Sequence, residues 1–104
     1  MSDERWVDLV QQSVGGAVSE GTMFGSRGLR TGRKFFAIWW HGKLVAKLPA
    51  ERMERLVGAG EAEPFEPMDG RTMGGWAVLS PGLDWPALAD EARAHVVAQQ
   101  EGSR

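Results

Sequence analysis

The first apolar pattern along the chain has the period of a helix. Between residues 3 and 17, apolar side chains recur at spacings of three and four, with polar residues between them. This spacing places the apolar side chains on one face of an α-helix. The predicted face comprises Trp6, Leu9, Val10, Val14 and Ala17. Gly15 and Gly16 weaken the end of this helix, and Gly21 lies in the connection that follows.

From Met23 the period changes to that of strands. Three short runs rich in aromatic and branched residues occupy residues 23–30, 34–40 and 43–48. Thr31-Gly32 and His41-Gly42 separate them. An X-Gly pair between two such runs is typical of a hairpin, because glycine adopts the positive φ that tight turns need. The pattern predicts three antiparallel strands in a meander.

A second helix is predicted to begin at Pro49, where the missing N–H of proline costs nothing. Its apolar face comprises Met53, Leu56 and Val57, and Gly58 and Gly60 end it. Residues 61–75 are loop-rich, although two prolines there are compatible with a short edge strand around Phe65.

The last two elements are a strand over residues 76–80 and a helix over residues 85–100. Asp84 is expected to be the N-cap of this helix. Its inward face is expected to consist of Trp85, Leu88, Ala89, Ala92 and Val96. The predicted order is α-β-β-β-α-β-β-α, which indicates an α+β domain.

The composition is that of one small globular domain. The 104 residues are 42% hydrophobic and 25% charged, so we expect a single domain with its core at about residues 5–98. No cysteine is present, which excludes disulfides and thiolate chemistry. The N-terminal residues do not resemble a signal peptide, and no run approaches the roughly 20 apolar residues that cross a bilayer. We therefore expect a cytoplasmic protein without a membrane association.

The sequence offers little catalytic chemistry. The glycines of GSRGLRTGRK lack the spacing of a phosphate-binding loop and lead into a strand. His41 is predicted in a turn and His95 at the edge of a helix's buried face, and neither has a partner at a metal-ligand spacing. Ser26 does not lie in a nucleophile elbow, because residue 24 is Phe. We expect no enzyme, no cofactor and no metal site.

Several short motifs together resemble a known family. They are Met23-Phe24-Gly25, GRKFFA at 32–37, LVAKLP at 44–49, Pro64-Phe65, Gly70-Arg71-x-Met73 and Trp76. The chain resembles the N-terminal domain of the TfoX/Sxy family and, more distantly, the YjbR-like proteins. The likeness runs from about Trp6 to Val97.

This resemblance implies a two-layer α+β domain with an antiparallel sheet and helices on one face. It supplies no catalytic residues. Family members named for natural competence act as transcriptional co-regulators and carry a second, C-terminal helical domain, which the 104 residues do not include. The implied function is a small interaction or regulatory module.

Strand alternation predicts which side chains leave the helix-covered face. A two-residue turn at His41-Gly42 pairs Trp40 with Lys43 and Ile38 with Val45, and a turn at Thr31-Gly32 pairs Phe24 with Trp39 and Arg27 with Phe36. Phe35, Ala37, Trp39, Leu44, Ala46 and Leu48 then face the helices. The predicted open face, the candidate interaction surface, comprises Arg27, Phe36, Ile38, Trp40, Lys43, Val45 and Lys47.

Monomeric proteins rarely expose an apolar patch of this size, so we expect other residues or a partner to cover this face. The loop 61–75 or the C-terminal tail folds over it, a second copy covers it in a homodimer, or another partner does. Residues 23–48 carry six basic and no acidic residues, whereas the remainder carries 6 basic and 14 acidic residues. This distribution is either chance clustering on solvated strands or a basic face for an acidic partner. The leading hypothesis is a non-enzymatic interaction module, expected to be a homodimer. The alternative is weak nucleic-acid binding through the same basic, aromatic face.

Overall fold

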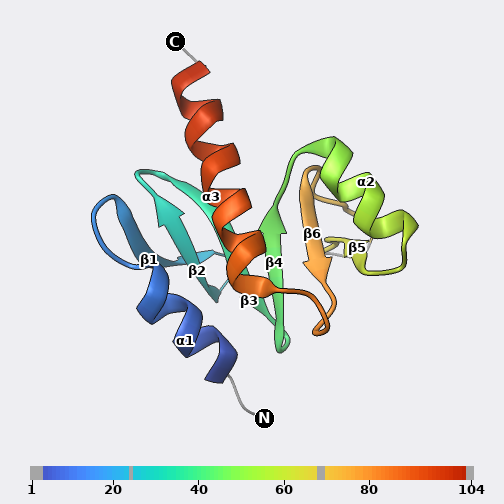
Figure 1. Cartoon of the computed structure of the whole chain (residues 1–104), viewed down its shortest axis with the longest axis horizontal. Helices are drawn as coiled ribbons and strands as arrows, with labels where there is room; N and C mark the ends of the chain where they lie inside the picture. The colour runs from blue at the N-terminus through green and yellow to red at the C-terminus, as the bar shows by residue number, and fades with distance from the viewer. Residues whose placement is uncertain (1–3, 24, 68–69, 103–104) are drawn as a thin grey trace.

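The computed structural model describes residues 4–23, 25–67 and 70–102. Three helices pack on one face of a six-stranded antiparallel sheet (Figure 1), which confirms the predicted α+β fold. The helices are α1 (Glu4–Ser13), α2 (Ala50–Gly58) and α3 (Trp85–Gly102). The strands are β1 (Val18–Met23), β2 (Ser26–Thr31), β3 (Lys34–Trp40), β4 (Lys43–Lys47), β5 (Ala62–Pro64) and β6 (Trp76–Leu79), in the sheet order β1-β2-β3-β4-β6-β5.

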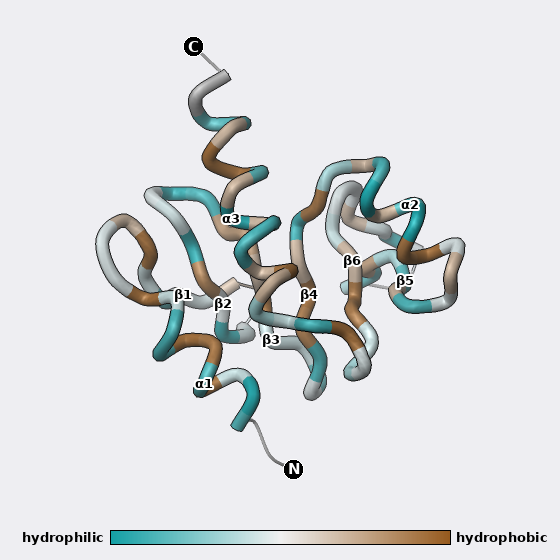
Figure 2. Tube along the Cα trace, in the orientation of Figure 1, coloured by the Kyte–Doolittle hydropathy of each residue, from teal (hydrophilic) through white to brown (hydrophobic). Residues whose placement is uncertain are grey.

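The larger core lies between the helices and the sheet. Trp39 of β3 stacks on Trp6 of α1 with ring centroids 5.8 Å apart, and it meets the edge of Trp85 of α3 at 5.7 Å. Hydrophobic and hydrophilic positions alternate along the helices in Figure 2, and the inward face predicted for α3 is buried throughout. Large aromatic side chains at the centre of this layer fix both terminal helices to the same strand.

The N-terminal region contains a strand that the hydrophobic pattern did not predict. Helix α1 ends at Ser13 instead of residue 17, Val14 and Ala17 are exposed, and the predicted start at residue 3 lies outside the described residues. Strand β1 then pairs along its length with β2. The predicted strand 23–30 is thus two strands, with a turn at Gly25, whose φ is 74°. The interior of β1 is small and polar, so it gave no alternation signal.

The β3–β4 hairpin has the predicted register. Ile38 pairs with Val45 and Trp40 with Lys43. His41 and Gly42 have φ values of 51° and 79°, and positive φ at both central residues defines the type I′ turn that suits a two-residue hairpin. This hairpin carries the middle of the sheet, and its register sets the faces of the residues discussed below.

A β-bulge in β3 changes the predicted faces on one side of the sheet. Leu29 pairs with Ala37 and Arg30 with Phe35, so Phe36 is an extra residue in the ladder. Phe36 and Ala37 both join the helix-side core, and Phe35 lies on the opposite face. The placement predicted for Phe35 and Phe36 is therefore wrong. The pairing predicted for Phe24 lies outside the described residues.

The face opposite the helices is covered by the chain itself. Ile38, Val45, Phe65 and Trp76 form a second buried cluster, against which Met73, Phe35 and Trp40 pack. Two backbone hydrogen bonds hold the segment between β5 and β6 in place. The Phe65 N–H donates to the Trp76 carbonyl (3.1 Å), and the Met73 N–H donates to the Phe65 carbonyl (2.9 Å). Of the covers considered above, the loop 61–75 is the one that the structure contains.

Two termini of helices follow their sequence signals. The Asp84 carboxylate accepts a hydrogen bond from the Ala87 N–H (3.2 Å), which is the predicted N-cap of α3. Pro49 occupies the N-cap position of α2 with an extended ψ of 148°. Among the described residues, no helix combines the length and the apolar character needed to span a bilayer.

Candidate functional site

The predicted interaction surface does not form one face. Arg27 lies on the helix side, where it lines a hollow of about 220 Å³ with Trp6 and Val10 and faces Glu20 at 4.0 Å. The bulge in β3 explains this position, because one extra residue inverts the face of β2 relative to the hairpin. Phe36 is buried in the same layer. Both placements correct the prediction.

Ile38 and Val45 lie on the predicted face, but neither is open. Both have 0% of their surface exposed, because Phe65 and Trp76 cover them. The apolar side chains that motivated a homodimer are therefore satisfied within one chain. A homodimer stays a prediction without that support.

Trp40, Lys43 and Lys47 remain accessible, at two separate places. Trp40 and Lys43 line a hollow of about 370 Å³ beside the β3–β4 turn. Lys47 lies at the other end of β4, half-buried, and lines a different groove. The structure therefore divides the three residues between two sites.

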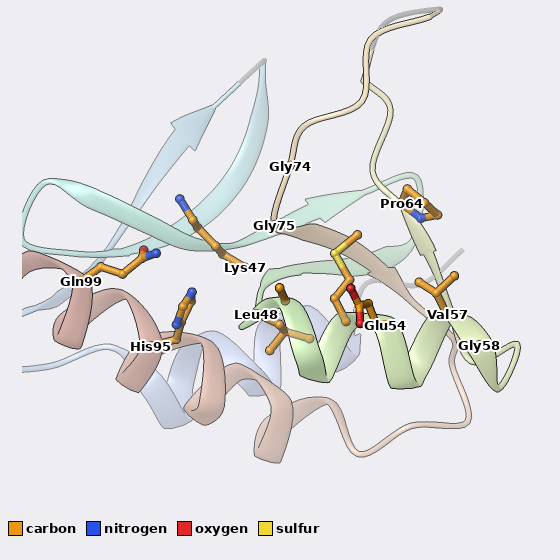
Figure 3. Close-up of a pocket in the computed structure, with 12 residues that line it drawn as sticks. Lys47, Leu48, Glu54, Val57, Gly58, Pro64, Gly74, Gly75, His95 and Gln99 are labelled. Carbon is orange, nitrogen blue, oxygen red and sulfur yellow. The ribbon is translucent and has the colours of Figure 1, made fainter.

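The groove at Lys47 has a volume of about 710 Å³ and lies between α2 and α3 (Figure 3). This volume is within the range of about 300–1,000 Å³ that is usual for small-molecule sites. Its lining residues are Lys47 and Leu48 at the end of β4, Ala50, Met53, Glu54, Val57 and Gly58 of α2, His95 and Gln99 of α3, and Pro64, Gly74 and Gly75.

The α2 wall of the groove is apolar because of the helical period. Met53 and Val57 are separated by four positions and therefore lie above one another on one face. Both are partly buried and pack against the helix-side core, of which Leu48 is a member. Glu54, beside them, is exposed and carries the acidic side chain of this wall.

The opposite end of the groove is polar. Figure 3 shows Lys47, His95 and Gln99 at this end, with the amine of Lys47 pointing away from His95, while Glu54 lies with α2. The Lys47 ammonium is 6.0 Å from the centroid of the Trp76 ring, at the limit of a cation–π contact. Burial lowers the pKa of His95 from its ordinary value of 6.5, and the positive charge of Lys47 lowers it further. The imidazole is therefore neutral at pH 7, beside a cation.

An ion pair joins the two helices that form the groove. The Arg52 guanidinium of α2 donates two hydrogen bonds to the Glu91 carboxylate of α3, at 3.0 and 3.3 Å. Such a bidentate pair fixes orientation as well as distance. Because Glu91 precedes His95 by one helical turn, this contact positions the α3 side of the groove relative to α2.

Sequence reasoning did not find this groove. Lys47 was assigned to a sheet face and His95 to the edge of a buried helix face. Their proximity depends on how α3 crosses the end of β4, which no short motif records. Among the described residues, no group of three His, Asp or Glu side chains is placed to hold a metal ion.

Comparison with known families adds an independent observation. A sequence profile of the TfoX N-terminal domain matches residues 8–98. The chain belongs to the TfoX N-terminal domain family. The match covers nearly the whole chain and includes Lys47, Met53 and His95, whereas Gln99 lies one residue beyond it. A search of curated proteins with the sequence of this chain finds no match.

Proposed function

We propose that this TfoX N-terminal domain is a non-enzymatic binding module that holds a small ligand in the groove between α2 and α3. The observation that carries the proposal is the groove itself, with an apolar wall on one side and the polar side chains of Lys47, His95 and Gln99 at one end. Ligand sites commonly combine a mostly apolar lining with a few convergent polar groups.

The elements around the groove favour recognition without a large rearrangement. Leu48 is anchored in the core, and its N–H donates to the Gly75 carbonyl (2.9 Å). The Arg52–Glu91 pair joins the two helices. A site whose walls are already held in place loses less conformational entropy when a ligand binds.

The distribution of basic side chains weighs against the nucleic-acid alternative. A phosphate-binding face needs its cations on one surface. Arg27 lies beside α1 and faces Glu20, Arg30 donates to the Ser19 hydroxyl on the other face, and Lys43 is separated from Lys47 by the length of β4. The groove therefore supports the binding-module proposal better.

A test is to map amide chemical shifts while a panel of small apolar and amphipathic fragments is added. We expect the shifts to concentrate at Lys47, Met53, Val57 and His95. Ala50→Trp fills the groove from an exposed position and should abolish them. Ala94→Trp is the matched control, since Ala94 is exposed on α3 and does not line the groove.

Two outcomes would count against the proposal. One is a panel that produces no shifts in the groove. The other is equal loss of binding in both Trp variants, which would indicate a general effect of the bulky side chain. Shifts at Trp40 and Lys43 upon addition of a mixed single-stranded oligonucleotide would favour the alternative function.

A further inference from the structure

We propose that the groove between α2 and α3 recognises a small carboxylate with an apolar tail. The carboxylate lies between Lys47 and His95, and the tail lies along Met53 and Val57. This inference rests on the proposed function, because it names the class of ligand that the same groove takes.

The polar end of the groove has the donors that a carboxylate needs. Lys47 offers an ammonium with three donors and no acceptor, and His95 offers a ring N–H. No ion pair of Lys47 is found within the described ranges. Because Lys47 is half-buried, an anion there interacts with a cation that is screened less than one on the open surface.

The rest of the groove suits an alkyl chain. Leu48, Met53, Val57 and Pro64 provide apolar surface that continues from the polar end along α2. Methionine is unbranched and adapts to chains of different shape. The acidic side chain of the lining, Glu54, lies with α2, away from the end of the groove that Lys47 and His95 line.

A bound carboxylate would also couple to the protonation of His95. Lys47 of β4 is the charged group that acts on this imidazole, Glu54 of α2 lines the same groove, and Glu91 on α3 is held by Arg52. Without ligand, burial and Lys47 lower the pKa of His95. The negative charge of a bound carboxylate favours the protonated form of the imidazole. Binding therefore takes up a proton and strengthens as the pH falls.

The experiment compares three probes with the same eight-carbon chain below their micelle concentrations: octanoate, octan-1-ol and octylammonium. Calorimetry with the wild type at pH 7 should show octanoate binding at least about tenfold tighter than the alcohol, the factor expected for a charge-assisted hydrogen bond. Octylammonium should bind more weakly still. Octanoate affinity should rise between pH 7.5 and 6.

The variants separate the roles of individual charges. Lys47→Met should weaken octanoate binding at least about tenfold. Lys43→Met removes one positive charge at the exposed β3–β4 turn, at the other end of β4, and should leave octanoate binding unchanged. Glu54→Gln should not weaken it, because this change removes a negative charge from the lining. Should Lys47→Met lower the melting temperature, Lys47→Arg provides the second variant and should retain binding.

The outcomes distinguish this inference from the proposed function. Equal affinity for octanoate and octan-1-ol, or no effect of Lys47→Met, would overturn the carboxylate assignment while the groove remained a ligand site. Preference for octylammonium would overturn it as well. Absence of every fragment and probe from the groove would instead contradict the proposed function.

Discussion

The ring of Phe35 lies directly against Gly28. A Cβ added to Gly28 would lie 2.9 Å from Cδ2 of Phe35 and 2.9 Å from the backbone carbonyl of Ala37. Gly21 pairs with Gly28, and a Cβ added to Gly21 would lie 3.0 Å from Cζ of the same Phe35 ring. Two glycines on neighbouring strands thus form the flat surface on which Phe35 packs, on the face opposite the helices.

Gly28→Ala should therefore destabilise the domain by about 1–3 kcal/mol, because the carbonyl cannot move away without disturbing the ladder. Chemical denaturation measures the difference. Gly58→Ala is the control: its Cβ would meet open space at the end of α2. That change should be neutral or should stabilise by up to about 1 kcal/mol through the unfolded chain. Equal effects at both positions would refute the packing argument.

The cover over the second face predicts the outcome of a charge placed beneath it. Ile38→Glu should destabilise the domain by about 3–5 kcal/mol, because Ile38 is fully buried among the apolar side chains of Val45, Phe65 and Trp76. Thr22→Glu places the same side chain at an exposed strand position and should change stability by no more than about 0.5 kcal/mol. A well-folded Ile38→Glu protein would show that this face is open.

The N-cap of α3 is expected to contribute measurably to stability. Asp84→Ala removes the acceptor of the Ala87 N–H and should cost about 1 kcal/mol. Asp90→Ala, at an exposed position within the same helix, should have an effect within about 0.5 kcal/mol. Thermal melts of the two variants make the comparison, and a larger loss from Asp90→Ala would contradict the capping role.

His95 should make stability depend on pH. Since its folded pKa is lowered from 6.5, the unfolded chain binds this proton first as the pH falls. The contribution of His95 to stability is therefore lost as the pH falls below 6.5 towards the folded pKa. His95→Gln should reduce that loss.

Urea midpoints measured between pH 7.5 and 5 test this expectation. The difference between the wild type and His95→Gln should decline on acidification, and the other titrating groups cancel in that difference. A wild type that gains stability relative to His95→Gln at low pH would reverse the sign and contradict a lowered pKa of His95.

Local signals predicted much of this fold from sequence. The His41-Gly42 turn fixed the β3–β4 register, and Asp84 marked the start of α3, because both depend on residues within a few positions of one another. The extra residue at Phe36 has no local signal. Its side chain is apolar like its neighbours, and only the partner strand shows that the ladder gains one residue there.

Strand β1 lacked alternation, so the prediction contained no partner for β2 on that side.

The candidate site was predicted much less well than the fold. The groove depends on where α3 crosses the sheet, and Lys47 and His95 come together only through that crossing. Alternation along β4 could place Lys47 on a face, beside Trp76, but could not show that it lines the same groove as residues of α2 and α3.

Pro64 has a consequence for how the sheet ends. In β5, the Glu61 carbonyl accepts from the Ser80 N–H, and the Phe65 N–H donates to the Trp76 carbonyl, so alternation turns residues 62 and 64 towards the outer edge. Proline has no N–H, which leaves the Ala62 N–H as the outward donor of this three-residue strand. The Ala62 and Pro64 carbonyls still point outward, but a further strand would find a single donor on a strand of three residues, so the β5 edge disfavours the edge-to-edge growth that leads to aggregation.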